Sequence, residues 1–371
     1  MSKIYDVVVL GANPAGLAAA GFLAKQGCDV AVVSHGGAPV ECPLHTWVPR
    51  DFFKLKELPK GLQRSSGARE FRRVAFHSMA LDREVAHKSR TTLGYLLPVD
   101  KLTRALRSAA TKAGAKVRNT TTAPAIQLKE DRAELLGSQT IVGRVLLVAQ
   151  DRPSDIIGEL SLPVRTVPRS SLVVAGLDVP LAKSPPKELA GALHVAELPE
   201  RSELGLFFAY DSTLHVRVIS ASAAAGNRAS ELSTLVAGLQ EAGVIPEVLG
   251  LAKATGAVWH PPAGVALELE SHVAKRCILV GTAGGFVETI TGHTLYPTVQ
   301  SALLGANVVQ EALGSEKTQD KLMSFKGVWR KSLADYLRPP NTSLHMLMPL
   351  LFANQRIIPK FTRALLLGQN I

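Results

Sequence analysis

The amino-acid sequence predicts an α/β protein with an inserted antiparallel sheet and a helical C-terminal tail. A short apolar run, Ile4–Leu10, leads directly into a glycine turn and an alanine-rich segment, Leu17–Ala24, as expected of a buried strand followed by a helix. Residues 165–255 hold runs of β-branched and aromatic residues at near-alternating spacing, which indicates antiparallel strands. The chain beyond Gly314 is helical in pattern.

The N-terminal segment has the strand, glycine turn, helix, strand order of a Rossmann-like dinucleotide-binding unit. Gly11 and Gly16 fill the first and third glycine positions of this turn. Asn13 fills the middle one, where it tolerates a left-handed backbone but adds a side chain at the place where a pyrophosphate would approach. The second strand, expected at Asp29–Val33, is followed by Ser34, so the carboxylate that normally holds a ribose hydroxyl is absent there.

A second small-residue turn lies late in the chain. The apolar run Cys277–Val280 ends at Gly281–Phe286, a further turn follows at Thr291–Thr294, and a helix is expected from Tyr296 to Gly314. Glycines at these places let the backbone come close to a ligand, and the helix start directs its amides at that ligand. We therefore expect this turn to complete the site begun by the first one.

The segments between the two turns predict the remaining architecture. Two short strands are expected at Arg72–Ser78 and Glu84–Arg90, then a helix capped by Asp100 that ends at Gly114, and two or three strands in residues 123–147. Residues 36–70 read as irregular. In the antiparallel region we expect strands at Ser171–Val174, Gly191–Glu197, Leu204–Tyr210 and Leu214–Ser220, and a helix at Ser230–Ala242. We predict three regions. Residues 1–164 and 256–315 together form the Rossmann-like domain, residues 165–255 form an inserted antiparallel-sheet domain, and residues 316–371 form a helical C-terminal region.

Composition limits the function classes. The 371 residues are 46% hydrophobic and 20% charged, which favours a globular protein with a large core. The net charge of +11 comes from scattered Lys and Arg without a stacking platform, so we expect no nucleic-acid partner. Three cysteines without a CxxC pair, and no leader-like start or membrane-length apolar run, favour a cytoplasmic protein. The tail Leu344–Leu367 suits either an interfacial membrane helix or a helix packed on the core.

Four segments, in order, resemble the FAD-dependent oxidoreductases of the geranylgeranyl reductase type, relatives of the aromatic hydroxylase and tryptophan halogenase flavoproteins. They are Gly11–Gly16, Tyr95–Gly114, Leu146–Ser154 and Val280–Gly314. The resemblance implies a glutathione-reductase-like FAD-binding domain, an inserted substrate domain and an external electron donor. It also implies a cofactor site formed by the residues of the two turns: Gly11, Asn13, Pro14, Ala15, Gly16, Ser34, Gly281, Thr282, Ala283, Gly284, Gly285, Thr291, Gly292, His293 and Thr294.

The sequence departs from that family at five positions that customarily contact FAD. Thr282 stands where the family has the aspartate that binds the ribityl chain, Gln150 replaces an aspartate, and Val99 replaces an arginine. Asn13 and Ser34 complete the set. Each loss of a buried polar contact costs about 1–3 kcal/mol, so together they weaken FAD binding by several powers of ten unless other contacts replace them.

Three interpretations follow from this pattern. In the first, the protein is an FAD-dependent oxidoreductase that transfers hydride through the flavin to an apolar, isoprenoid or lipid substrate, with the inserted sheet as the pocket wall. His293 is then a candidate to tune or protonate the flavin, although a histidine that closes the turn is the simpler reading. In the second, FAD binding is weakened or lost and the protein is a noncatalytic binding or scaffold protein. The third is a flavin monooxygenase or halogenase.

Overall fold

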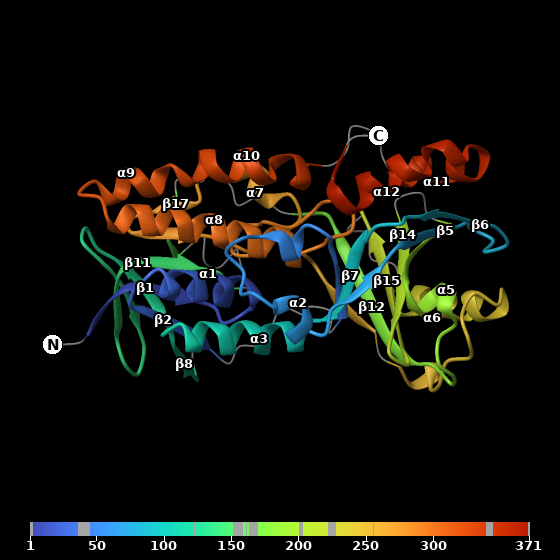
Figure 1. The fold of residues 1–371 in the computed structure, drawn as a ribbon, viewed down its shortest axis with the longest axis horizontal. Coiled ribbons are helices and arrows are strands. Elements are labelled where there is room, and N and C mark those ends of the chain that lie inside the picture. Colours follow the sequence, from blue (N-terminus) through green and yellow to red (C-terminus); the bar gives the residue numbers. More distant parts are fainter. Residues whose placement is uncertain are drawn as a thin grey trace.

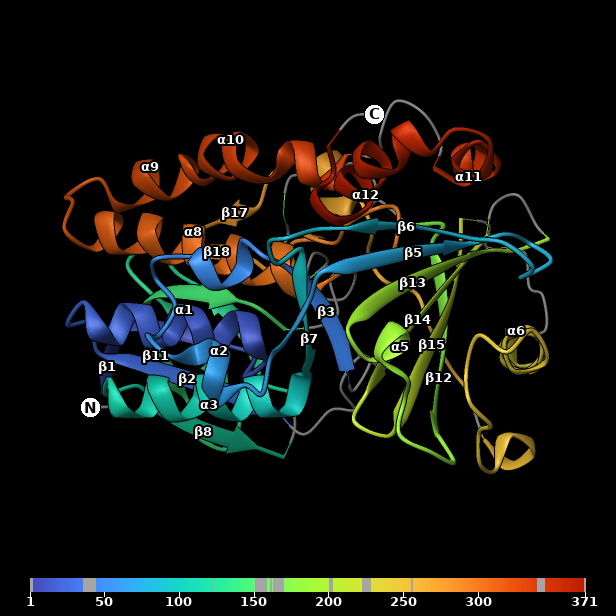
Figure 2. The ribbon, with the colours of Figure 1, turned by 45° about the vertical axis from the view of Figure 1, so that its right-hand side comes forward.

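The computed structural model describes residues 3–35, 45–121, 123–150, 159–160, 162, 170–199, 203–221, 228–254, 256–338 and 344–369 (Figure 1). Two β-sheet units lie side by side, and the C-terminal helices run along one edge of both (Figures 1 and 2). The predicted α/β class, with a parallel sheet, a second sheet and a helical tail, is confirmed. The end of one predicted segment, Leu146–Ser154, lies beyond Gln150 and therefore outside the described residues.

The first sheet contains the N-terminal strand. Its strands, in sheet order, are β17 (Val273–Ala274), β18 (Cys277–Leu279), β11 (Ile141–Val148), β1 (Ile4–Leu10), β2 (Val30–His35) and β8 (Lys116–Thr120), extended by β10 (Ala133–Leu136) on β11 and by β9 (Ala125–Leu128) on β10. β1 is parallel to β11 and to β2, with Leu10 opposite Val148 and Val33. Because β18 is also parallel to β11, the carboxyl ends of β1, β11 and β18 meet at one edge of the sheet.

One face of this sheet is covered by three helices, α1 (Pro14–Lys25), α3 (Val99–Lys112) and α8 (Leu295–Leu313). Alternate residues of β1 serve the two faces: Val7 packs with these helices, whereas Val8 packs on the side of β9 and β10. Gly21 lets α1 and α3 approach closely, because a Cβ there would lie 3.3 Å from the Ala110 Cα. The alanine-rich sequence of α1 thus follows from its place between α3 and α8.

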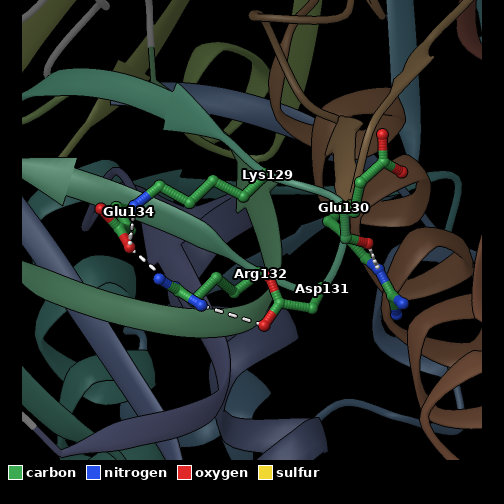
Figure 3. Close-up of polar contacts among 6 residues, drawn as sticks. Lys129, Glu130, Asp131, Arg132 and Glu134 are labelled. Atoms are coloured by element: carbon green, nitrogen blue, oxygen red, sulfur yellow. Dashed lines mark hydrogen bonds and ion pairs between the residues drawn. The ribbon is translucent and has the colours of Figure 1, made fainter.

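The opposite face is covered by the β9–β10 hairpin, which is held by charged contacts. Lys129 Nζ and Arg132 Nε donate to the Glu134 carboxylate at 2.7 and 2.8 Å (Figure 3). Arg276, in the turn between β17 and β18, donates from Nε to the Glu130 carbonyl oxygen at 2.8 Å. The hairpin is therefore tied to the start of β18, the strand whose other end leads into the second glycine turn.

The second sheet is mainly antiparallel. Its strands, in sheet order, are β16 (Ala257–Trp259), β12 (Val173–Pro180), β15 (Thr213–Ser220), β14 (Glu203–Tyr210), β13 (Ala192–Glu197), β5 (Arg73–His77) and β6 (Glu84–Lys88). The four strands expected within residues 171–220 are confirmed, and so is the pair at residues 72–90. The pair joins this sheet through a parallel contact of β5 with β13, so the sheet extends beyond residues 165–255.

The two faces of the second sheet bury different partners. We call the inner face the one that carries Val174, Leu206 and Ile219, and it packs with the last helices of the chain. The outer face carries Leu177 and Val216 and packs under α6 (Arg228–Glu241), the helix expected at residues 230–242. Alternating side chains thus let one sheet serve two separate cores.

Shorter elements connect the two sheets. A three-stranded sheet has the order β3 (His45–Pro49), β7 (Gly94–Pro98) and β4 (Arg69–Phe71). The remaining short elements are η1 (Phe52–Lys54), α2 (Leu62–Ser65), α5 (Lys187–Ala190), η2 (Leu251–Lys253), α7 (Val265–Glu268) and η3 (Gln355–Ile357). Residues 45–70, expected to be irregular, therefore contain strands and short helices.

The tail forms four helices, α9 (Thr318–Met323), α10 (Phe325–Leu337), α11 (Leu344–Ala353) and α12 (Ile358–Leu367). α10 packs on α8, whereas α11 and α12 lie on the inner face of the second sheet (Figure 2). Across the described ranges, no helix is both long enough and apolar enough to cross a membrane.

One predicted helix start is wrong. Asp100 was expected to cap α3, but Pro98 is the N-cap residue, and Asp100 lies in the first turn, where its carboxylate accepts from Arg104 Nη2 at 2.6 Å. Pro98 is the last residue of β7, and its extended backbone passes directly into the helix without a polar cap. An acidic residue in the first turn still suits the helix dipole.

Replacing Phe361 with alanine should destabilise the protein by about 3–5 kcal/mol, because it removes a fully buried ring from the α12 interface. This ring meets the Phe76 ring of β5 edge-on, with centroids 5.2 Å apart. Urea unfolding measures the loss. The neighbouring Lys360→Ala, at an exposed position, should change stability by less than about 0.5 kcal/mol. Equal effects of the two substitutions would contradict the packing described for α12.

Candidate functional site

The two glycine turns come together at the carboxyl edge of the first sheet. Gly11 has φ of +114°, and a Cβ there would lie 2.9 Å from the Gln150 amide nitrogen, just beyond the end of β11. Gly281 has φ of +61°, and a Cβ there would lie 3.3 Å from the Ala15 Cβ. Glycine is required at both places by conformation and space together. The turns thus form a single junction under the starts of α1 and α8.

Asn13 closes the first turn with its own side chain. Its Oδ1 accepts from the Gly16 amide at 3.0 Å, as in a helix N-cap. Its Nδ2 donates to the Ala149 carbonyl oxygen at 2.5 Å, across to the end of β11. An amide at the start of α1 that could bind a phosphate oxygen is therefore occupied by the chain itself.

Residues of the second turn also form hydrogen bonds with other segments of the chain. The Gly281 amide donates to Ser301 Oγ at 2.9 Å, and the Thr282 hydroxyl donates to the Gln150 carbonyl oxygen at 3.4 Å. Through this bond Thr282 faces the first turn. The structure brings Gly11, Asn13 and Thr282 together around the Ala149-Gln150 backbone, as the sequence predicted for the two turns.

His293 is buried at the start of α8. Its ring stacks on the Trp47 indole with centroids 4.3 Å apart, and its Nε2 accepts from the Tyr296 amide at 3.3 Å. Burial lowers the pKa of His293 to about 3, so the imidazole is neutral at physiological pH. In this geometry the Nε2 of His293 accepts a hydrogen bond at the start of α8.

Other predicted site residues pack within the protein. A Cβ at Gly284 would meet the Phe286 ring at 2.6 Å, and one at Gly285 would meet the Val265 Cβ at 2.6 Å. Ala283 is fully buried, and Ser34, at the end of β2, accepts through its carbonyl oxygen from Thr120 Oγ1 at 3.4 Å. These glycines are thus required for packing around the turn, whatever the turn binds.

Gly292 joins the second turn to the second sheet. A Cβ there would lie 2.9 Å from Leu172 Cδ2 and 3.1 Å from Val174 Cγ2. The glycine turns and the inner face of the second sheet are therefore in direct contact. A ligand held at the turns would meet this sheet on its apolar side.

Glu288, which the sequence reasoning missed, organises the second turn from behind. Its carboxylate accepts from the amides of Ile290 and Thr291 at 2.5 and 2.8 Å and from the Thr291 hydroxyl at 2.8 Å. Burial raises the pKa of Glu288, and these bonds act against that rise. The Tyr336 hydroxyl is also buried in this region and has no hydrogen-bond partner within the part of the chain that the structure describes. A single acidic residue in an apolar turn was the signal available in the sequence.

A second missed group lies on the inner face of the second sheet. Asp178 on β12 contacts Arg217 Nη1 at 2.7 Å and His215 Nδ1 at 2.9 Å, both on β15. Burial would raise the pKa of Asp178, but the contacts with His215 and Arg217 hold it below its ordinary value. The Arg217 guanidinium lies 5.9 Å from the centroid of the Trp259 ring. His215 and Arg217, two residues apart in an apolar strand, were the sequence signal for this group.

One set of potential metal ligands occurs in the described ranges, on the outer face of the second sheet: His77, Glu84 and His194. His77 Nε2 and His194 Nδ1 are hydrogen-bonded at 2.9 Å, and His194 Nε2 lies 3.2 Å from the Glu188 carbonyl oxygen. The Glu84 carboxylate is paired with Arg73. A cation beside the carboxylate disfavours a metal ion, so the arrangement is a hydrogen-bonded brace between strands.

Replacing His293 with glutamine should make stability less sensitive to acid. The folded-state pKa of about 3 lies below the ordinary value, so the unfolded chain takes up a proton first and stability falls as pH drops from about 6.5 to about 3. His293→Gln should remove about 1.4 kcal/mol per pH unit from this slope. Urea unfolding between pH 7 and pH 4 measures it, with the exposed His260→Gln as control. An unchanged slope would show that His293 is not buried neutral.

Comparisons with known proteins agree with this geometry. Residues 5–150 match the family model of the pyridine nucleotide-disulphide oxidoreductases. A search of curated proteins finds no match to the sequence. The solved structures that share the fold include a geranylgeranyl bacteriochlorophyll reductase-like protein from Thermoplasma acidophilum, 17% identical, with a TM-score of 0.71 over 97% of this chain and 88% of that one.

Two further structures show the same fold. The probable FAD-dependent monooxygenase PqsL from Pseudomonas aeruginosa is 17% identical, with a TM-score of 0.70 over 97% of this chain and 99% of that one. A triple mutant of a flavin-dependent brominase is 11% identical, with a TM-score of 0.69 over 98% of this chain and 96% of that one. At these identities the similarity concerns the fold. The chain thus has the fold of the flavin-dependent oxidoreductases and monooxygenases, as its sequence motifs predicted, and its N-terminal part matches the pyridine nucleotide-disulphide oxidoreductase family.

Proposed function

We propose that the protein is an FAD-dependent oxidoreductase that binds its flavin weakly and acts on an apolar substrate. The observation that carries this proposal is the junction of the two glycine turns at the carboxyl edge of the parallel sheet, because ligands of such sheets bind at that edge. A fold shared over nearly the whole chain with flavin-dependent proteins supports it.

The residues of the junction have distinct roles in this proposal. The backbone of Gly11–Gly16 holds the phosphates at the start of α1, and the Thr282 hydroxyl takes the place of the ribityl-binding carboxylate. When bound, the flavin supplies hydride transfer. Asn13 must give up its bond to the Gly16 amide before a phosphate can use that group. This exchange of one hydrogen bond for another is the physical reason for weak binding.

The inner face of the second sheet supports an apolar substrate. Its side chains include Val174, Leu206 and Ile219, and it contacts the second turn through Gly292. Asp178 with its two partners adds one polar position, which could orient a polar group of the substrate. The reductase-like neighbour makes an isoprenoid or lipid the substrate class to test first.

A noncatalytic binding or scaffold protein is the second candidate, and three contacts favour it. Asn13, Thr282 and His293 all turn their side chains onto the protein's own backbone. A site satisfied in this way is stable without a ligand. A flavin monooxygenase or halogenase is the third candidate, favoured by the monooxygenase and brominase neighbours. Oxygen consumption with reduced flavin separates it from a reductase.

FAD titration of the purified protein tests the proposal directly. Weak binding predicts substoichiometric flavin after purification, and a rise in melting temperature when FAD is added. At a hundredfold excess of FAD over Kd, the free energy of unfolding should rise by about 2.7 kcal/mol. A colourless protein whose melting temperature does not respond to FAD would exclude the enzyme and leave the noncatalytic candidate.

The double variant Asn13→Gly with Thr282→Asp should bind FAD about tenfold to a hundredfold more tightly. It frees the Gly16 amide and supplies a carboxylate for the ribityl hydroxyls. Flavin fluorescence quenching gives the Kd. Gln139→Gly with Thr91→Asp, at exposed positions away from the turns, is the matched control and should leave Kd unchanged. Equal affinity of both double variants would mean that this junction does not hold FAD.

A further inference from the structure

Helix α11 exposes apolar residues to solvent. Its buried side carries Leu344, Met348 and Leu351, which pack on the inner face of the second sheet. On the opposite side Met346 and Leu350 are 68% and 49% exposed. The exposed Pro349 and Ala353 continue the same stripe at helical spacing. The outward face of α11 is thus as apolar as its buried face.

Helix α12 places cations beside this stripe. Ile358, Phe361 and Leu365 are buried against the same sheet face, whereas Lys360 and Arg363 are exposed. The exposed Arg356 precedes them in η3. Because both helices bury one side on a single sheet face, their other sides face outward together, along the upper edge in Figures 1 and 2.

Acidic residues are missing from this end of the sequence. The last 36 residues, which follow Asp335, contain no Asp or Glu but four cations, Arg338, Arg356, Lys360 and Arg363. Further exposed cations, Lys321, Lys326, Arg330 and Lys331, lie on α9 and α10, which run along the same upper edge (Figure 1). Residues 315–371 also carry three carboxylates, Glu316, Asp320 and Asp335, and contribute +6 to the net charge of +11 of the whole chain.

We propose that this surface docks on an anionic lipid membrane. We call it the tail surface and define it as Met346, Pro349, Leu350 and Ala353 of α11 with Arg356, Lys360 and Arg363. An apolar stripe enters the interface between headgroups and acyl chains, and adjacent cations meet the lipid phosphates, as in peripheral amphipathic helices. Residues 336–371 contain no side-chain carboxylate, so no side chain of this segment repels an anionic surface.

Other occupants fit the tail surface less well. A second copy of the chain docked through a twofold axis would place Arg356, Lys360 and Arg363 close to the same three cations of its partner. A protein partner would need an apolar groove with an acidic rim around it. An anionic bilayer offers negatively charged headgroups above apolar acyl chains at every point of its surface. The proposal concerns the outward sides of α11 and α12, not the glycine turns, and holds whether or not flavin binds at those turns.

Vesicle co-sedimentation tests the proposal on the full-length protein. The protein should sediment with vesicles of phosphatidylcholine containing about a third phosphatidylglycerol, and much less with phosphatidylcholine alone. Raising the salt from about 0.1 to 0.5 M should weaken binding, because it screens the cations. Failure to bind the anionic vesicles would overturn the proposal.

Matched variants assign the binding to this surface. Leu350→Glu should reduce the vesicle partition coefficient about tenfold or more, whereas Leu249→Glu, at an equally exposed leucine elsewhere (49% and 50%), should leave it unchanged. Lys360→Gln with Arg363→Gln should reduce it about fivefold for each cation lost. Equal effects of the two leucine variants would overturn the proposal. So would a dimer in light scattering that Leu350→Glu dissociates while vesicle binding persists, since that would assign the surface to self-association.

Discussion

The closeness of three strand ends is the constraint on which the rest of the structure depends. Gly11 lies so near the Gln150 backbone that no side chain fits between them, and Gly281 touches Ala15 across the same edge. The first contact fixes where α1 begins, because this helix follows the Gly11 turn at once. The second holds the Gly281 turn beside the start of α1, and the chain reaches α8 after the further turn at Thr291–Thr294. The helices in turn carry α3 and α10, so the layer over the first sheet is positioned by a few glycines. Any ligand of the turns must enter a junction whose backbone spacing is already set by the protein.

The hydrogen bonds already formed at this junction decide how strongly it can bind a cofactor. In an open anion site the amides at a helix start have no partner until the ligand arrives. Here the side chains of Asn13 and His293 serve one amide each at the starts of α1 and α8. A phosphate or flavin oxygen would therefore replace existing bonds, and only the difference in strength would appear as affinity. The same geometry can thus bind a cofactor weakly or remain closed without one. The free-energy difference between the bound and the closed state comes from the difference in strength of a few hydrogen bonds.

Local sequence patterns predicted most strands and helices. The features that they did not predict depend on contacts between segments far apart in the chain. The buried strand Ile4–Leu10 and the two turns follow from composition and glycine spacing alone. The parallel pairing of β5 with β13 joins segments more than a hundred residues apart, and no local pattern encodes it. Gly284 and Gly285 satisfy a packing need against Phe286 and Val265, and a sequence cannot distinguish that need from approach to a ligand. His215 and Arg217 stand out in an apolar strand, but they meet Asp178 only once β12 and β15 pair, so the sequence does not show that the three residues form one group.

Helices α11 and α12 lie between the proposed substrate site and the proposed membrane-docking surface. α11 and α12 bury one side on the inner face of the second sheet, which we propose as the wall of an apolar substrate site, and expose the other on the tail surface. A helix layer is about 10 Å thick, so a substrate at that wall would lie one helix diameter from a docked bilayer. Lipids and isoprenoids partition into bilayers and are scarce in water, because each buried methylene contributes about 0.8 kcal/mol. Docking through the tail surface would therefore supply such a substrate from the phase in which it is concentrated, and the apolar face of α11 would have a physical reason to remain uncovered.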